Sequence, residues 1–269
     1  MNILDGKKVR DELVISLKER LSGCDKTLAI ILVGDREDSK TYVKHKIIMA
    51  EKIGIQTKMI LCSDVVPEEK LISTIDSLNK DNDIGGIIVQ LPLPDTLDKQ
   101  KVLDSIYINK DVDALSTAAW NKINRGDNCI YPATATGIIT LLDKYNIDVK
   151  GKKVSVIGRS NLVGKPVAML LNKRGANVTV CHTQTEDVPG ITKKSDIIIS
   201  AAGVPNLITK DYVSRGQIII DVGINKGLVG DVDFNEVSKV VEYITPVPGG
   251  VGPMTVISIF ENFARLVGK

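Results

Sequence analysis

The sequence predicts an α/β protein with two domains, each built on a parallel sheet that helices cover on both faces. Strand-like runs of Val, Ile and Leu alternate with helix-like segments along the whole chain, and this alternation is typical of parallel sheets. Most of the runs are continuously apolar, as expected for strands that are buried on both faces. The length of 269 residues corresponds to about two domains at ~150 residues each.

The first half of the chain supplies three helices and two strands to this prediction. Apolar residues recur at helical spacing from Val9 to Leu21 and again in the segment Pro67–Lys80. A third helix follows the polar segment Asp35–Ser39 and runs through Ile53. The β-rich runs Leu28–Val33 and Ile87–Gln90 are predicted strands, and the second ends at the prolines that follow it.

The second half repeats the alternation more regularly. The segment Asp113–Pro132 is expected to be irregular and to contain the boundary between the domains, because Asn124–Asn128 is a turn signal. A helix is expected from Thr255 to the C-terminus, after a Gly-Pro pair. Strands are predicted at Lys153–Ile157, Asn177–Cys181, Asp196–Ser200, Gln217–Asp221 and Val240–Ile244.

The composition excludes several classes of protein. A net charge of +2, from 35 basic and 33 acidic residues, gives no reason to expect nucleic acid or a membrane surface as a partner. The four cysteines are far apart and there are only two histidines, so no zinc-type metal site is expected. Isolated thiols, no apolar leader and no run near ~20 apolar residues indicate a cytoplasmic protein.

The first candidate site is a glycine turn, Gly158–Pro166, between a predicted strand and a predicted helix. Glycines let the backbone approach a phosphate, and a helix N-terminus offers free N–H groups to an anion. The next strand ends near Thr183 without the acid that would hold an NAD ribose, whereas Arg159 is available for a 2′-phosphate. The turn therefore favours NADP. An ordinary strand–turn–helix link, with Arg159 as a solvated loop residue, is the alternative.

The second candidate site combines a helix with a strand end. Tyr42 and Lys46 are four residues apart and share a helix face, and a buried lysine can transfer protons at a lowered pKa. Gln90 ends a strand, where parallel sheets form ligand clefts. Tyr-x-x-x-Lys also occurs in short-chain dehydrogenases, but there it follows the glycine loop, whereas here it precedes it by ~110 residues. An exposed helix with this pair is the plain alternative.

The third candidate is the segment Pro248–Thr255, which has three glycines and two prolines in eight residues. We expect a fixed loop that presents backbone amides to a ligand and then leads into the last helix. The bracketing prolines argue against the alternative, a flexible hinge.

Taken in order, these motifs resemble those of the bifunctional methylenetetrahydrofolate dehydrogenase/cyclohydrolase family over almost the whole chain. The segment Pro248–Thr255 is similar to the most specific signature of that family. The other matching motifs are Ser39-x-x-Tyr42-x-x-x-Lys46, Gln90-Leu91-Pro92-Leu93-Pro94, Lys110-Asp111-Val112-Asp113, Gly158-Arg159-Ser160 and Asp221-Val222-Gly223-Ile224-Asn225.

The resemblance implies NADP-dependent oxidation of methylenetetrahydrofolate and hydrolysis of the methenyl product to 10-formyltetrahydrofolate. It implies a homodimer with a folate substrate, without nucleic acid or membrane. Residues 1–118 and 253–269 would form the folate-binding domain, onto which the C-terminal helix packs back, and residues 119–252 the Rossmann-like NADP domain. The implied catalytic residues are Lys46, Tyr42, Gln90 and Asp113. Folate would also contact Ser39, Leu91, Pro248, Gly249 and Gly250, and NADP would contact Gly158, Arg159, Ser160, Thr183 and Ile224.

Three positions depart from the family pattern. Ala114 stands where Gly is usual, Ala135 where Pro is usual, and Gln184 where Lys is common. The last change removes a possible charge near the 2′-phosphate and so weakens the expected preference for NADP. Two other functions stay open from the sequence: a dehydrogenase without cyclohydrolase activity, and a dinucleotide- or folate-binding regulatory protein without turnover.

Overall fold

The computed structural model describes residues 1–269, and the chain divides into two compact units. The six-stranded unit comprises Met1–Asp11 and Thr134–Thr255, and the three-stranded unit comprises Glu12–Ala133 and Val256–Lys269. The expected domain boundaries lay at 118/119 and 252/253, whereas the units meet at 11/12, 133/134 and 255/256. These points fall within helices α1 (Gly6–Arg20), α6 (Ala133–Lys144) and α10 (Val251–Leu266).

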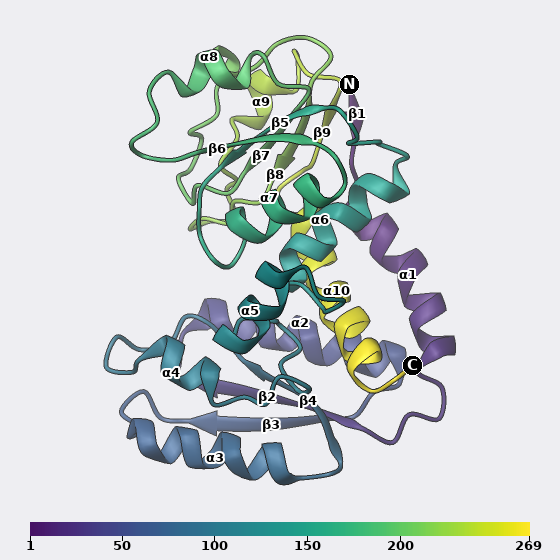
Figure 1. Cartoon of the computed structure of the whole chain (residues 1–269), viewed down its shortest axis with the longest axis vertical. Helices are drawn as coiled ribbons and strands as arrows, with labels where there is room; N and C mark the ends of the chain where they lie inside the picture. The colour runs from purple at the N-terminus through teal and green to yellow at the C-terminus, as the bar shows by residue number, and fades with distance from the viewer. The chain divides into compact units, whose positions relative to one another are not determined.

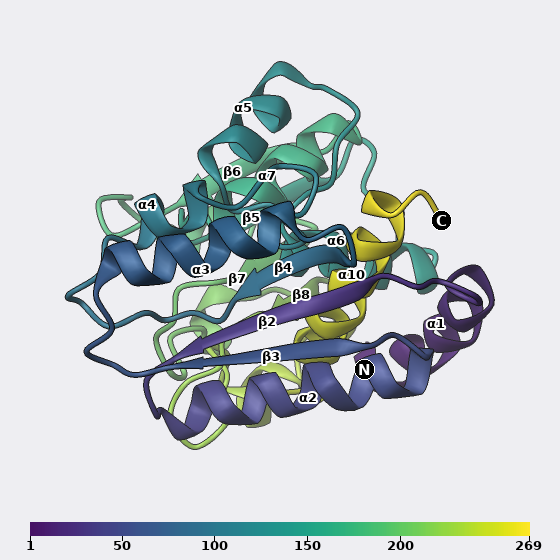
Figure 2. The same ribbon diagram turned by 90° about the horizontal axis from the view of Figure 1, so that it is seen from below.

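The three-stranded unit holds a parallel sheet in the order β3-β2-β4. Its strands are β2 (Thr27–Val33), β3 (Thr57–Cys62) and β4 (Ile84–Val89). Helices α2 (Glu37–Ile53) and α3 (Glu68–Lys80) lie on opposite faces of this sheet (Figure 2). The two-sided cover expected from the apolar runs is thereby confirmed for β2, which is buried along almost its whole length.

One face of that sheet forms a continuous apolar core with α3. Ala29, Ile31 and Val33, which alternate along β2, pack there with Leu71 and Ile75. The short helix α4 (Lys99–Asp104) completes this layer. Alternate residues of a strand point to one face. One set of β2 side chains therefore packs on the face covered by α3, and the other set points to the face covered by α2.

The C-terminal helix packs back on the three-stranded unit, as expected. Phe260 and Phe263 are fully buried, and Phe263 lies against the glycine pair Gly85–Gly86 of β4. A Cβ on Gly86 would lie 2.9 Å from Phe263 Cδ2, so the missing side chains let the helix approach the strand. Asn262 donates from Nδ2 to Val112 O at 2.9 Å, which joins the helix to the segment after β4.

The six-stranded unit is also entirely parallel, in the order β1-β9-β8-β7-β5-β6 (Figure 1). Its strands are β1 (Asn2–Ile3), β5 (Lys153–Ile157), β6 (Asn177–Cys181), β7 (Ile197–Ser200), β8 (Ile218–Asp221) and β9 (Tyr243–Ile244). The helical elements between them are α7 (Gly164–Lys173), α8 (Val188–Thr192), η1 (Lys210–Tyr212) and α9 (Phe234–Val237). One face of the sheet packs on α8 and α9 through Ile157, Ile198, Ile219 and Val237. This arrangement confirms the predicted Rossmann-like fold.

Three sequence expectations about elements were wrong. The segment Asp113–Pro132 is not irregular throughout, because α5 (Thr117–Arg125) lies in it, capped by the Ser116 hydroxyl. The last helix begins at Val251 rather than Thr255, since Pro253 falls in the first turn, where no N–H is needed. The predicted strand Val240–Ile244 contains only β9. None of the helices combines the length and apolar character needed to cross a membrane.

Candidate active site

One face of helix α2 carries the residues of the second sequence motif. Ser39, Tyr42 and Lys46 are three and four residues apart, so the helix places them in one row. Ser39 and Lys46 are buried, with 2% and 7% of their surface exposed, and Tyr42 is half-buried. The plain alternative of an exposed helix is therefore wrong for Lys46, whose charged group lies inside the three-stranded unit.

Lys46 is held by Gln90, the residue that follows the last residue of β4. Lys46 Nζ donates a hydrogen bond to Gln90 Oε1 at 2.8 Å. Gln90 Nε2 donates to Leu91 O at 2.6 Å, which fixes the amide with its oxygen toward the lysine. The Gln90 N–H bonds to Ile31 O at 2.9 Å, so the sheet itself holds the glutamine backbone. Two residues that are 44 positions apart in the sequence thus meet through one polar contact.

Burial and a nearby carboxylate act against each other on Lys46. Burial lowers the pKa of Lys46, and the charge of Asp113 raises it by a smaller amount. Burial likewise raises the pKa of Asp113, and Lys46 opposes that shift. The two groups are counter-charges in a poorly solvated site. A lysine whose pKa is lowered by burial can take up and release protons close to neutral pH.

The loop that carries Asp113 is fixed by buried polar contacts. Asp111 is buried and accepts a hydrogen bond from the Ser116 N–H at 2.9 Å. Burial raises the pKa of Asp111, and the charge of Asp113 adds to that shift. Ala114 has φ of 53°, a left-handed conformation that glycine adopts at lower cost. The departure from the family pattern at position 114 therefore preserves a backbone turn that normally favours glycine.

Lys110 has a structural role that the sequence did not reveal. Its ammonium donates to Leu78 O at 3.1 Å, to Asn79 O at 2.7 Å and to Asp81 O at 2.7 Å. These carbonyls lie at the end of α3, where the last groups of a helix lack partners. Lys110 therefore caps that helix, and its charge is not available for chemistry at Asp113.

Ser39 has a fully enclosed polar atom without a partner. Its Oγ is enclosed and makes no hydrogen bond in the protein. Unpaired buried hydroxyls are rare in folded proteins and call for an explanation. A ligand that contacts this face of α2 would provide the missing hydrogen bond, which fits the expectation that Ser39 binds substrate.

The predicted loop Pro248–Gly250 belongs to the six-stranded unit. Gly249 has φ of 119°, and its carbonyl accepts from the Lys7 N–H at 3.1 Å. A Cβ on Gly250 would lie 2.7 Å from Pro246 O, and one on Gly6 would lie 1.8 Å from Gly250 O. The loop is thus packed in place, as expected, and not a hinge. Lys46, Gln90 and Asp113 belong to the three-stranded unit.

The glycine turn follows β5 as predicted, and two of its glycines have no room for a side chain. Gly158 has φ of 114°, and a Cβ there would lie 2.2 Å from Ala201 O. A Cβ on Gly164 would lie 2.1 Å from Gly158 O, so α7 begins directly against the turn. Close backbone packing of this kind leaves N–H groups at a helix N-terminus, the arrangement that binds phosphate in Rossmann folds.

The side chains of the turn and the neighbouring strand ends fit an anionic dinucleotide. Arg159 is exposed, and its guanidinium makes no hydrogen bond or ion pair within the protein. Ser160 Oγ accepts from the Val163 N–H at 3.2 Å and so closes the turn. Thr183, beyond β6, and Ile224, beyond β8, are both exposed. These four residues and Gly158 lie beyond the carboxyl ends of their strands, where such sheets bind nucleotides.

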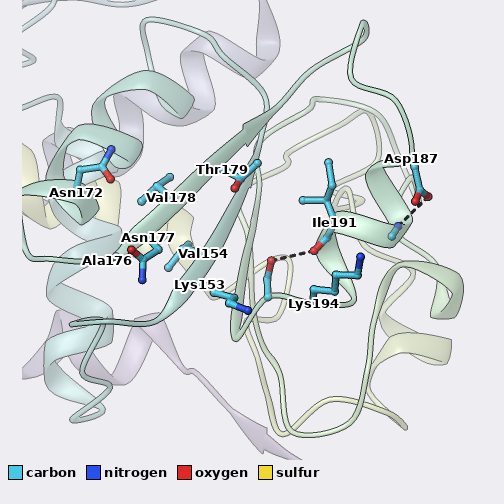
Figure 3. A pocket seen from close by; sticks show the side chains of 12 residues that line it. Lys153, Val154, Asn172, Ala176, Asn177, Val178, Thr179, Asp187, Ile191 and Lys194 are labelled. Carbon is cyan, nitrogen blue, oxygen red and sulfur yellow. Dashed lines mark hydrogen bonds between the residues drawn. The ribbon is translucent and has the colours of Figure 1, made fainter.

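The pocket in Figure 3 does not contain any of the predicted site residues. Its lining includes Lys153 and Asn177, the first residues of β5 and β6, together with Asp187 and Lys194. It therefore lies at the amino ends of these strands, opposite to the glycine turn. No group of three or more His, Cys, Asp and Glu side chains is arranged to hold a metal ion.

The chain is similar to known proteins over nearly its whole length. The chain matches sequence models of the tetrahydrofolate dehydrogenase/cyclohydrolase catalytic domain over residues 4–113, and of its NAD(P)-binding domain over residues 132–269. It is 46% identical over 269 residues to the bifunctional protein FolD of Moorella thermoacetica, with 97% of this chain and 96% of the relative covered.

Two solved structures are similar over nearly the full length. The bifunctional methylenetetrahydrofolate dehydrogenase/cyclohydrolase FolD of Campylobacter jejuni has a TM-score of 0.96 and 43% identity, covering 100% of this chain and 99% of that one. The Trypanosoma brucei dehydrogenase-cyclohydrolase, complexed with NADP cofactor and inhibitor, has a TM-score of 0.94 and 34% identity, covering 99% and 97%.

Proposed function

The chain belongs to the tetrahydrofolate dehydrogenase/cyclohydrolase family, and from this premise we propose which of its residues carry out the two reactions of a bifunctional enzyme. The first reaction oxidises 5,10-methylenetetrahydrofolate to the methenyl compound with NADP. The second hydrolyses the methenyl compound to 10-formyltetrahydrofolate. Both belong to one-carbon metabolism.

Lys46 is the proton-transfer group of the hydrolytic reaction. Water adds to the methenyl carbon, so it must lose a proton. The ring nitrogen that leaves this carbon must gain one. The buried ammonium, with its lowered pKa and its bond to Gln90 Oε1 at 2.8 Å, is suited to both transfers. The 2.8 Å contact of a buried lysine is the observation that carries this assignment. Tyr42, on the same helix face, assists it.

Folate binding falls to residues of the three-stranded unit. The Asp113 carboxylate makes no hydrogen bond in the protein and is available to the N–H groups of a pterin ring. Ser39 Oγ, which lacks a partner, offers a second polar contact. Leu91 adds a contact there, and the folate contact expected from the loop Pro248–Gly250 stays a prediction.

The dehydrogenase reaction requires orientation more than proton transfer. When bound, NADP supplies the hydride acceptor. Gly158, Ser160 and Ile224 line its site, and Arg159 pairs with the 2′-phosphate. No carboxylate follows β6 before Glu186 to hold an unphosphorylated ribose, so the site favours NADP over NAD. Thr183 adds a hydroxyl at that strand end.

A single assay tests the proposed function against its two alternatives. Purified protein is mixed with methylenetetrahydrofolate and NADP, and NADPH and methenyl absorbance are followed together. NADPH formation with transient methenyl absorbance is expected. Methenyl compound that accumulates and is never hydrolysed by the enzyme would indicate a dehydrogenase alone. Absence of NADPH and of NADH, with either cofactor, would indicate a binding protein without turnover.

We also propose that the chain forms a homodimer through the free edge of β3. Leu61 on β3 and Val65 beyond it are 73% and 80% exposed, and Ile48 on α2 lines the groove beside Leu61. An unpaired strand edge with exposed apolar side chains favours pairing with another chain. Sedimentation equilibrium should give a dimer for the wild type and for the control Ile15→Glu, and a monomer for Leu61→Glu.

The four free cysteines support a cytoplasmic location.

A further inference from the structure

Two buried carboxylates lie at the carboxyl ends of β7 and β8 and have no counter-cation. Asp221 is the last residue of β8, and Asp231 follows ten residues later; both are buried. Ser200, the last residue of β7, pairs with Asp221 across the sheet. Buried carboxylates without a cation must be stabilised by hydrogen-bond donors, so the donors show what each carboxylate holds in place.

Asp231 collects four donors from two different loops. Its Oδ2 accepts from the Ala202 N–H at 2.8 Å, from the Gly203 N–H at 3.0 Å and from Ser200 Oγ at 3.3 Å. Its Oδ1 accepts from Asn225 Nδ2 at 3.1 Å. The first three donors lie at the end of β7 and in the loop after it, and the fourth lies in the loop after β8. A single side chain therefore ties the two loops together.

Asp221 holds Asp231 in that position. Its carboxylate accepts from the backbone N–H groups of Gly223 at 2.9 Å, Asp231 at 3.0 Å and Val232 at 3.0 Å. A Cβ on Gly230 would lie 1.9 Å from Asp221 Oδ2. The backbone on both sides of Asp231 is thus closed around Asp221, and Asp231 has little freedom to move.

The loop that Asp231 holds also supports the glycine turn. Ala201 O is the atom that a Cβ on Gly158 would meet at 2.2 Å, so the turn rests on the loop after β7. The loop after β8 carries Ile224. The next residue, Asn225, donates a hydrogen bond from its side chain to Asp231. Asp231 therefore lies behind two of the segments assigned to the dinucleotide site, although its own side chain is fully buried.

Resting on the proposed function, we propose that Asp231 is a positioning residue for NADP, which fixes the loops after β7 and β8 in the conformation that binds the dinucleotide. A carboxylate is required because all four partners are donors, and a carboxylate is acceptor-only. In an asparagine, an NH₂ group replaces one of the two carboxylate oxygens. That NH₂ group would face a donor, and neither of the two groups would then have an acceptor.

The test compares Asp231→Asn with Asp233→Asn, the same chemical change two residues along. Asp233 caps α9 through the Glu236 N–H at 3.3 Å, and asparagine caps helices equally well. Calorimetry of the folate-free protein should give an NADP dissociation constant raised at least about tenfold for Asp231→Asn and unchanged for Asp233→Asn. Cyclohydrolase kcat and KM, measured without NADP, should stay at wild-type values for both.

Three results would overturn the proposal. NADP affinity could be the same in Asp231→Asn as in the wild type, or the cyclohydrolase activity could fall together with NADP affinity, which indicates general damage. If Asp231→Asn does not fold, the second variant is Asn225→Ala, which removes one of the four donors to Asp231 at a partly exposed position. The third contradicting result would be an NADP affinity in Asn225→Ala equal to that of the wild type. A wild-type protein that binds no NADP would refute the proposed function itself.

Discussion

In the proposed mechanism, the ammonium of Lys46 is needed for only one of the two reactions. We predict that Lys46→Met lowers the cyclohydrolase kcat by ~10²–10⁴-fold, the usual contribution of a general acid or base, while dehydrogenase activity remains measurable. Methionine has a similar length and suits a buried position, so folding should be retained. Initial rates of both reactions on one preparation check this.

The exposed Lys44→Met, on the same helix, is the control for Lys46. Its two rates should match those of the wild type. Equal loss of both activities in a folded Lys46→Met variant would show that the lysine binds substrate rather than transferring protons.

Arg159 should distinguish NADP from NAD. Its guanidinium is free in the protein, and a charge-assisted contact to a 2′-phosphate corresponds to about ten- to a hundredfold in affinity. We predict that Arg159→Ala lowers kcat/KM for NADP by that factor and leaves kcat/KM for NAD nearly unchanged. Lys193→Ala, which removes an exposed cation just after α8 in the same unit, should change neither. Equal losses with both cofactors would mean that Arg159 supports the turn without contacting the phosphate.

At the scale of elements, the helix α10 both packs on the three-stranded unit and holds the segment that carries the proposed folate residue Asp113. Asn262 is buried and donates from Nδ2 to Val112 O and to Tyr131 O, both at 2.9 Å. We predict that Asn262→Ala lowers the free energy of unfolding by about 1–3 kcal/mol, because two buried carbonyls lose their donor. Val112 adjoins Asp113, so KM for folate should rise while NADP affinity stays constant. Urea unfolding and steady-state kinetics measure these effects, and a stable variant with unchanged folate KM would contradict the prediction.

The sequence predicted the strongly patterned elements and missed the weakly patterned ones. β2, β7 and β8 were found because their apolar runs are continuous. β3 was missed because it is an edge strand with a half-exposed pattern, and its residues Thr57–Cys62 include Lys58 and an exposed Leu61. α5 was missed because the turn signal at its end dominated the interpretation of the whole segment.

The candidate site was predictable as a set of residues but not as a set of contacts. Spacing placed Tyr42 and Lys46 on one helix face, yet nothing in it indicates that Lys46 Nζ reaches Gln90 Oε1, 44 residues away. The roles of Lys110 and Asp231 follow only from their partners, most of which are backbone groups. Local patterns contain no information on such long-range backbone contacts, and this explains the omission.

At the scale of the whole molecule, neither unit is a continuous stretch of chain. The six-stranded unit includes Met1–Asp11 because β1 pairs with β9, where Asn2 is opposite Tyr243. A strand of two residues has no sequence pattern to recognise. Pairing over such a separation is costly in loop-closure entropy until the rest of the sheet exists, so β1 should join the sheet after the strands β5 to β9.

The stability of the molecule should depend on pH through Asp221. Burial raises the pKa of Asp221 to about 6 from 3.8, and its hydrogen bonds only partly offset this. The folded state therefore binds a proton more tightly than the unfolded state between these two values. Such a group contributes most stability below pH 3.8, and this contribution is lost as the pH rises through 6.

We therefore predict a pH-dependent difference between the wild type and Asp221→Asn. The variant cannot titrate at this position, so subtracting its unfolding free energy cancels the titration of other groups. Relative to the variant, the wild type should lose about 2 kcal/mol between pH 4 and pH 7, since each unit of pKa shift corresponds to about 1.4 kcal/mol and part of the titration lies below pH 4. Urea unfolding of both proteins at a series of pH values measures the difference. A flat or rising difference would show that Asp221 is ionised throughout, held by its three backbone donors.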